Sequence, residues 1–238
     1  AQGKYDEAEP LFREAVEVRR ETFGDRHRRT LISIGRLGVL LQTKGDFVAA
    51  EPLCREALEV QRETLGSRHP NTLASIINLG SLLQDDGDLA AAEPLLCEAL
   101  EGMREILGSR HPSTLNSMMN LGGLLYSKGD LAAAEPVCRE ALEVRRETLG
   151  SRHPHTLTSI HNLGSLLEAK GDLATAEPLY REALEMRRET LGNWHPDTLV
   201  AIQSLARCAA EGQGSETFAR SLARMKSLIA RYAAEGQG

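Results

Sequence analysis

Aromatic residues are scarce in this chain of 238 residues, making up 4% of it with a single tryptophan. The hydrophobic share of 41% is mostly leucine and alanine, a composition that favours helices over sheets. No apolar run approaches the length of a membrane span, and no signal peptide precedes the repeated pattern described below. We therefore expect an all-α protein that has no membrane as a partner.

The chain also lacks a surplus of positive charge. Lysine and arginine number 28 against 34 aspartates and glutamates, the formal net charge is -6, and the two signs alternate along the sequence. A general nucleic-acid binder needs a concentrated positive field to displace counterions from phosphates. Nucleic acid is therefore not expected as a partner.

Cysteine is infrequent, and its spacing indicates no metal site. The four cysteines form no CxxC pair, and none lies near a histidine at metal-ligand spacing. Cys54 and Cys138 occupy the same position of a repeated pattern. The other repeats carry Phe12, Leu96 and Tyr180 at that position, which predicts that these cysteines are small buried hydrophobes. Unpaired thiols favour a reducing compartment, so we expect a cytoplasmic protein.

What the sequence does contain is a repeat of 42 residues. Its clearest marker is a glycine that recurs at Gly24, Gly66, Gly108, Gly150 and Gly192. Residues 108–149 and 150–191 are identical at roughly three-quarters of positions, as duplication of one structural unit would produce. We expect one solenoid domain over residues 1–238. Its parts are a partial repeat at 1–24 that supplies only a second helix, full repeats at 25–66, 67–108, 109–150 and 151–192, and a divergent repeat or capping helix at 193–238.

Each repeat carries the pattern of two helices. In the fourth repeat Pro154 suits the first helical position and places His153 at the N-cap, while Gly171 ends the helix. Asp172 is then the N-cap of a second helix that runs to Gly192. Apolar spacing predicts buried residues at Leu157, Ile160, Leu163 and Leu167 in the first helix, and at Leu173, Ala176, Tyr180, Ala183, Leu184 and Leu191 in the second.

These stretches carry a family resemblance. "IHNLGSLL" at 160–167, followed by "AEPLY" at 176–180, resembles the tetratricopeptide repeat signature. The 42-residue period resembles the longer-helix type found in kinesin light chains and nephrocystin-like proteins. The resemblance implies a right-handed superhelical solenoid of antiparallel helix pairs whose first helices line a concave groove. HEAT and armadillo arrays have a comparable period and rank second. The small residues expected to let paired helices approach closely are Gly38, Gly80, Gly122 and Gly164.

The histidines that recur with the repeat are predicted to be helix caps and loop contacts. They are His27, His69, His111, His153 and His195. Packed helices lie about 8–10 Å apart, whereas zinc holds its nitrogens at about 2 Å, so equivalent histidines cannot share one metal. No P-loop, GxSxG motif or nucleotide-binding glycine pattern is present. We expect no cofactor, no metal and no catalytic residue. The second-helix glutamates are expected to pair along their own helix, for example Arg139 with Glu143.

A ladder of asparagines on the first helices is the candidate binding feature. A side-chain amide both donates and accepts, so it can hold an extended peptide whatever its sequence. The resemblance implies such contacts for Asn78, Asn120 and Asn162; a hydrogen bond between helices, or inheritance by duplication, is the alternative. For His161, a solvated polar residue and a peptide contact are both open. The predicted groove comprises Arg36, Ile77, Asn78, Ser81, Gln84, Met119, Asn120, Tyr126, His161, Asn162, Ser165 and Glu168.

Three functions are compatible with these features. The first is a non-catalytic scaffold or adaptor that binds peptide segments of other proteins in the groove. The second is a regulatory or sensor repeat region of a larger protein, for example one with an NTPase domain, since the chain begins in mid-repeat and without methionine. The third is a structural module that associates end to end through Leu11, Ala15 and Val18, which lack a neighbouring first helix. Residues 216–234 are expected to form an amphipathic capping helix.

Overall fold

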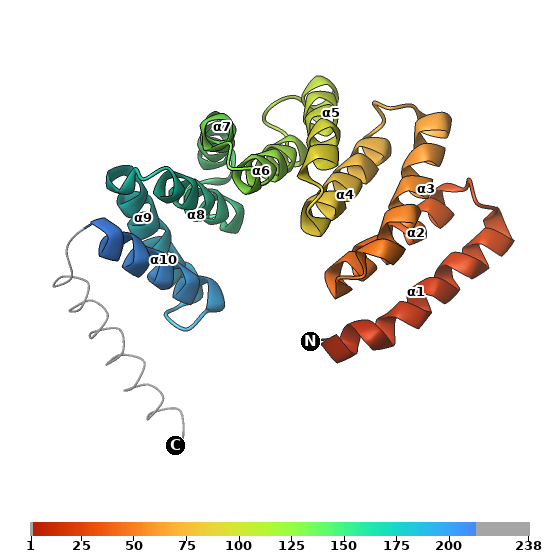
Figure 1. The fold of residues 1–238 in the computed structure, drawn as a ribbon, viewed down its shortest axis with the longest axis horizontal. Helices are drawn as coiled ribbons and strands as arrows, with labels where there is room; N and C mark the ends of the chain where they lie inside the picture. The colour runs from red at the N-terminus through yellow and green to blue at the C-terminus, as the bar shows by residue number, and fades with distance from the viewer. Residues whose placement is uncertain (1, 213–238) are drawn as a thin grey trace, which may run out of the picture. The chain divides into compact units, whose positions relative to one another are not determined.

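The computed structural model describes residues 2–212, which form ten α-helices and no strand (Figure 1). The predicted capping helix at 216–234 lies outside these residues. The helices are α1 Gln2–Phe23, α2 Arg28–Lys44, α3 Phe47–Leu65, α4 Pro70–Asp86, α5 Leu89–Leu107, α6 Pro112–Ser127, α7 Leu131–Leu149, α8 Pro154–Ala169, α9 Leu173–Leu191 and α10 Pro196–Gly212. Contacts divide the chain into two compact units, residues 1–130 with α1–α6 and residues 131–238 with α7–α10.

Helix boundaries follow the predicted signals closely. In the second unit, α8 begins at Pro154 and is followed by Gly171 at φ +81°. The Asp172 carboxylate accepts from the backbone N–H of Thr175 at 3.1 Å and caps α9, which ends before Gly192 at φ +85°. Residues that carry a Cβ rarely adopt such a positive φ, so glycine is the residue that allows the chain to turn there. The predicted pair of helices is confirmed.

All five recurrent histidines cap a first helix. In each case Nδ1 accepts a hydrogen bond from the backbone N–H two residues further on, at 3.1 or 3.2 Å. These histidines are His27, His69, His111, His153 and His195. The backbone at His69, for example, is extended, with φ -70° and ψ 139°, as an N-cap requires. The capping prediction is therefore confirmed.

Replacing His69 with alanine should lower the free energy of unfolding by about 1 kcal/mol, because one N–H group at the start of α4 loses its acceptor. His69→Asn should keep most of that stability, since an amide oxygen can accept the same bond. Urea unfolding followed by circular dichroism measures both variants. Equal stability of His69→Ala and the wild type would contradict the capping role.

The helices of a pair meet through small residues opposite large ones. A Cβ added at Gly38 would lie 2.7 Å from Cys54 Sγ, and one added at Gly80 would lie 2.7 Å from Leu96 Cδ2. In the second unit, a Cβ at Gly164 would lie 2.9 Å from Cε1 of Tyr180. Real Cβ contacts are longer than this, so the close approach predicted for these glycines is confirmed.

Most of the predicted core of the fourth repeat is buried, but Leu173 is only half-buried and Leu191 is exposed. Leu157, Ile160, Leu163 and Leu167 are at most 3% exposed, and Ala176, Tyr180 and Ala183 are fully buried. Leu191 is predicted to be buried, but 39% of it is exposed. It is the last residue of α9, directly before the turn at Gly192. Periodicity alone does not reveal that this turn of the helix reaches solvent.

None of the four cysteines forms a disulfide, and the two that recur with the repeat are unreactive. Cys54 and Cys138 are each 4% exposed, which confirms that they are packed as small hydrophobes. Burial raises the pKa of each thiol to about 11, so both stay protonated at neutral pH.

The second helices carry ion pairs that differ from those predicted. Arg139 bonds Glu135, one turn back on α7, rather than Glu143. Other arginines reach the second helix of the next repeat: Arg62 pairs with Glu98 at 2.6 Å in the first unit, and Arg146 with Glu182 at 2.7 Å in the second. Exposed pairs of this kind contribute about 0–1 kcal/mol each. They align neighbouring repeats more than they stabilise the fold.

Candidate peptide-binding faces

The first unit presents a mixed polar and apolar face on its first helices. α2 contacts α4, and α4 contacts α6, so their predicted site residues lie on adjoining helices. Asn78 and Asn120 are half-buried, and Arg36 is exposed. Within the part of the chain that the structure describes, neither of these two asparagine side chains has a hydrogen-bond partner. A hydrogen bond between helices therefore does not account for their recurrence.

Apolar and neutral polar side chains accompany these two asparagines. Ile77 and Met119 are half-buried, and Tyr126 is 43% exposed on α6. Ser81 and Gln84 are half-buried on α4. We call Asn78, Asn120 and these five residues the Asn78/Asn120 face. It combines amide groups that can bond a peptide backbone with apolar surface that can cover a side chain.

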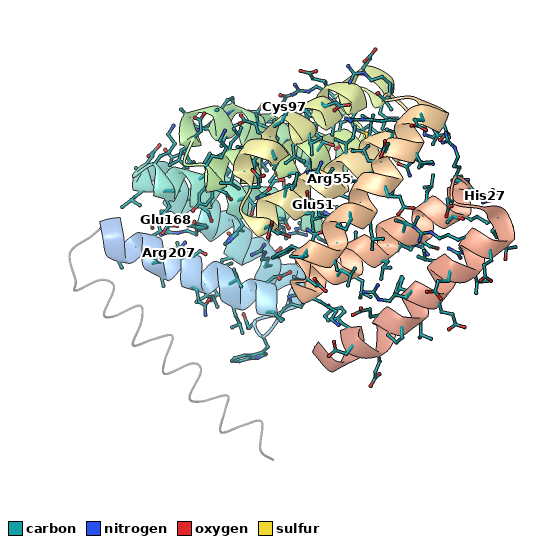
Figure 2. All side chains as sticks on the ribbon, turned by 45° about the vertical axis from the view of Figure 1, so that its right-hand side comes forward. His27, Glu51, Arg55, Cys97, Glu168 and Arg207 are labelled. Carbon is teal, nitrogen blue, oxygen red and sulfur yellow. The ribbon has the colours of Figure 1, made fainter. Side chains whose placement is uncertain are left out.

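In the second unit, the predicted groove residue Glu168 already accepts hydrogen bonds from other side chains of the protein. Arg207 of α10 donates from Nε and Nη2 to its two carboxylate oxygens, each at 2.7 Å, and Figure 2 shows the two residues facing one another. The Tyr180 hydroxyl donates to Glu168 at 2.6 Å and lies 3.0 Å from Ser165 Oγ. The Glu168 side chain is only 8% exposed. This network holds α8, α9 and α10 together and leaves little of Glu168 for a ligand.

The charges of this network perturb its pKa values. The Arg207 guanidinium holds the pKa of Glu168 below its ordinary value of 4.5, against the opposing effect of burial, and the Tyr180 hydroxyl assists. Burial, followed by the hydrogen bond to Glu168, raises the pKa of Tyr180, so its hydroxyl remains a donor. Because folding lowers the Glu168 pKa, the ionised pair stabilises the folded state fully above pH 4.5.

Acid should therefore weaken the second unit through Glu168. The stabilisation falls as pH drops from 4.5 through the lower folded-state pKa, because protonation removes the charge that Arg207 binds. Glu168→Gln should cost about 1 kcal/mol at neutral pH, and this difference from the wild type should shrink towards about pH 3. Urea unfolding of both proteins from about pH 7 to about pH 3 measures it. Parallel pH profiles would contradict the role given to Glu168.

His161 lies beside this network on α8. Its ring centroid is 5.5 Å from that of Tyr180, and its Nδ1 atom is buried with no hydrogen-bond partner among the described residues. Burial lowers the pKa of His161, and the nearby Arg187 and Arg207 lower it further. The ring is therefore neutral at pH 7. Asn162 beside it is exposed, and its side-chain amide likewise has no partner in the described part of the chain.

Sequence reasoning missed a set of buried polar residues that support the first helices. Arg145 is 4% exposed and donates to Ser159 Oγ at 2.7 Å and to the His155 carbonyl at 3.2 Å. Arg187 is 6% exposed and donates to the Asp197 carbonyl at 3.0 Å. The signal available in the sequence is their recurrence 42 residues apart, within a charged stretch that has the pattern of a solvated surface. They are structural, since each anchors the start of the next first helix.

The described helices contain neither a membrane span nor a metal cluster. Within residues 2–212, no helix is both long enough and apolar enough to cross a membrane. In that same range, no group of three or more histidine, cysteine, aspartate or glutamate side chains is arranged to hold a metal ion.

The fold is a solenoid of antiparallel helix pairs, which confirms the predicted fold class. The sequence profile of the tetratricopeptide repeat matches residues 1–53, 31–105, 77–136, 113–189 and 161–225. The chain therefore belongs to the tetratricopeptide repeat family. No curated protein sequence matches it.

Several solved structures are similar to this chain. One is a putative kinesin light chain from Podosopora anserina with nearly identical TPR-like repeats, 26% identical, with a TM-score of 0.78 over 86% of this chain and 96% of that one. Another is BtubC (BKLC) from P. vanneervenii, 22% identical, with a TM-score of 0.80 over 96% of this chain and 92% of that one. A Rap protein complexed with competence and sporulation factor is 14% identical, with a TM-score of 0.65 over 98% of this chain and 72% of that one. The resemblance to kinesin light chain repeats is thus confirmed.

Proposed function

We propose that this protein is a non-catalytic scaffold that binds extended segments of partner proteins on its first helices. The observation that carries the proposal is a set of side-chain amides at one position of the repeat that have no hydrogen-bond partner within residues 2–212. They are Asn78 and Asn120 in the first unit and Asn162 in the second. An accessible amide that the fold does not use can donate to and accept from a peptide backbone. The fold accommodates such a role, since a Rap protein of this fold was solved in complex with competence and sporulation factor.

The chemistry of the faces indicates a neutral or mixed segment rather than a free carboxylate. A carboxylate clamp needs several unpaired cations. Of the two arginines at these positions, Arg207 is bonded to Glu168, which leaves Arg36. In the second unit His161 complements Asn162. We infer that its proton is on Nε2, because a buried N–H without a partner costs more than an unpaired lone pair at Nδ1. Nε2 can then donate to a peptide carbonyl.

The test compares partners captured by the wild type and by a triple variant in which Asn78, Asn120 and Asn162 are alanine. A matched control is Asn71→Ala, which removes an amide from the first turn of α4, outside the proposed face. Circular dichroism first establishes that all three proteins are equally helical. Partners retained by the wild type and Asn71→Ala but lost by the triple variant support the proposal. Identical partner sets from all three proteins would overturn it.

A second proposal is self-association through α1. Leu11 is 65% exposed and Val18 is 52% exposed, whereas Leu53, at the same position of α3, is half-buried. An apolar helix face of this kind favours contact with another helix. Mass measured by light scattering should rise with protein concentration for the wild type but not for Leu11→Lys. A mass that stays that of the monomer at every concentration of the wild type would exclude self-association through α1.

A further inference from the structure

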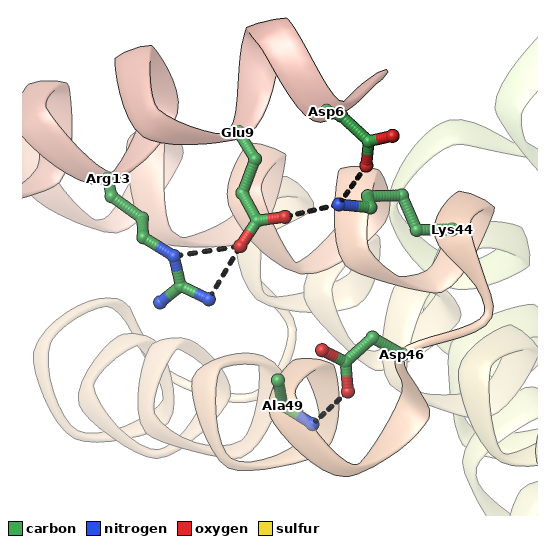
Figure 3. A network of polar contacts seen from close by, with 6 residues as sticks. All are labelled: Asp6, Glu9, Arg13, Lys44, Asp46 and Ala49. Atoms are coloured by element: carbon green, nitrogen blue, oxygen red, sulfur yellow. Dashed lines mark hydrogen bonds and ion pairs between the residues drawn. The ribbon is translucent and has the colours of Figure 1, made fainter. Parts of the chain in front are cut away.

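Three second-helix glutamates each bind a lysine at the end of the following first helix. In the first repeat Lys44 Nζ lies 2.6 Å from Glu9 Oε2 and 2.6 Å from Asp6 Oδ1, and Figure 3 shows the ammonium between the two carboxylates. The same contact joins Lys128 to Glu93 and Lys170 to Glu135, in each case across 35 residues of sequence. A lysine at this carboxylate is therefore a regular feature of the repeat.

One repeat of the first unit breaks this pattern. Glu51 of α3 stands 42 residues after Glu9, but Asp86, the last residue of α4, replaces the lysine found at Lys44 and Lys128. Among the described residues, Glu51 pairs only with the cation of its own helix, Arg55, at 2.7 Å. Asp86 is exposed and has no ion-pair or hydrogen-bond partner in the described part of the chain. A cation-binding position is thus left open.

The exposure of the glutamates agrees with an open position at Glu51. The Glu9 and Glu135 side chains, which each bind an arginine and a lysine, are 20% and 19% exposed. The Glu51 side chain, with its single arginine, is 36% exposed, and that of Glu93, with its single lysine, is 35% exposed. A glutamate side chain with two cations is thus about half as exposed as one with a single cation, and Glu51 belongs to the second group.

Asp86 does not benefit the isolated fold. The C-terminal end of a helix carries a partial negative charge, so an aspartate there is unfavourable where a lysine would be favourable. Residues that break a local rule without a compensating contact are expected at functional sites. Next to Glu51, Val48 is 88% exposed and stands where the partial repeat has Asp6, a partner of Lys44.

We propose that Val48, Glu51 and Asp86, here called the acidic corner, form a docking surface for a lysine side chain of a partner protein. The ammonium group takes the place that Lys44 has in the first repeat, and the aliphatic stem covers Val48. Asp85 and Asp88 add negative potential, although Asp85 also accepts from Gln42 at 2.7 Å and Asp88 caps α5. This surface is independent of the Asn78/Asn120 face.

The test uses the 238-residue chain labelled with ¹⁵N and the peptide acetyl-Gly-Lys-Lys-Gly-amide as the probe. Saturable shifts of the amides of Val48, Glu51 and Asp86 are expected in the wild type. Asp86→Lys supplies the missing lysine from within the chain and should weaken binding about fivefold or more. That variant should be at least as resistant to urea as the wild type, so weaker binding cannot be ascribed to unfolding.

Glu59→Lys is the matched control. Glu59 lies on α3 as well, is exposed, and its reversal changes the net charge by the same amount, so it should leave binding of the probe nearly unchanged. If Glu59→Lys and Asp86→Lys weakened binding of the peptide equally, overall charge would explain the loss of affinity and the proposal would be overturned. Absence of saturable shifts at the acidic corner in the wild type would overturn it as well.

Discussion

Replacing Leu79 with alanine should lower the free energy of unfolding by about 2–5 kcal/mol. Leu79 is 1% exposed in α4, immediately before Gly80, where that helix approaches α5 closely. The truncated side chain would leave a cavity that this close contact prevents from collapsing. Native proteins have a free energy of unfolding of about 5–15 kcal/mol in total, so this loss is a large part of it.

A matched truncation separates burial from the loss of a leucine as such. Leu11→Ala removes the same atoms from α1, where the side chain is 65% exposed, and should change stability by less than about 0.5 kcal/mol. Urea unfolding followed by the helical circular dichroism signal serves for both variants. Similar losses for the two substitutions would show that Leu79 is not a core residue.

The second large effect is expected from overpacking at Gly38. A leucine there would place its Cβ 2.7 Å from Sγ of the buried Cys54, and should cost about 1–3 kcal/mol. A Cβ added at Gly35, one turn earlier on α2, would have no atom within 4 Å, so Gly35→Leu should instead gain up to about 1 kcal/mol of helix propensity. A lower Tm for Gly38→Leu and a higher Tm for Gly35→Leu than for the wild type would confirm that the packing of α2 on α3 needs glycine at only one of these places.

The fold was predictable because every repeat contains the same local signals. A histidine before the first helix, proline at its start in most repeats, and glycine at its end fix the boundaries whatever the tertiary context. His69 and Gly87 show this in the first unit, and His153 and Gly171 in the second. The error at Leu191 arose because periodicity identifies the face of a helix but not how far its neighbour extends.

The side-chain pairs of the candidate sites were less predictable. Within one helix, partners follow from a spacing of three or four residues, yet Arg139 pairs with Glu135 rather than with Glu143. Between helices the spacing depends on how repeats are stacked, and Arg207 and Glu168 are 39 residues apart. The asparagines could be assigned to the first helices from sequence. That their side chains bond no other described residue could be seen only in the three-dimensional structure.

The spacing of contacts between repeats has a consequence for synthesis. Those of the first unit join residues 35 to 43 positions apart, as in Lys44 with Glu9, Arg62 with Glu98 and Gln42 with Asp85. Chains fold from the N-terminus as they leave the ribosome, and a short separation keeps the entropy of loop closure low. Each repeat can therefore complete its contacts once the next has emerged, so the order of folding can follow the order of translation.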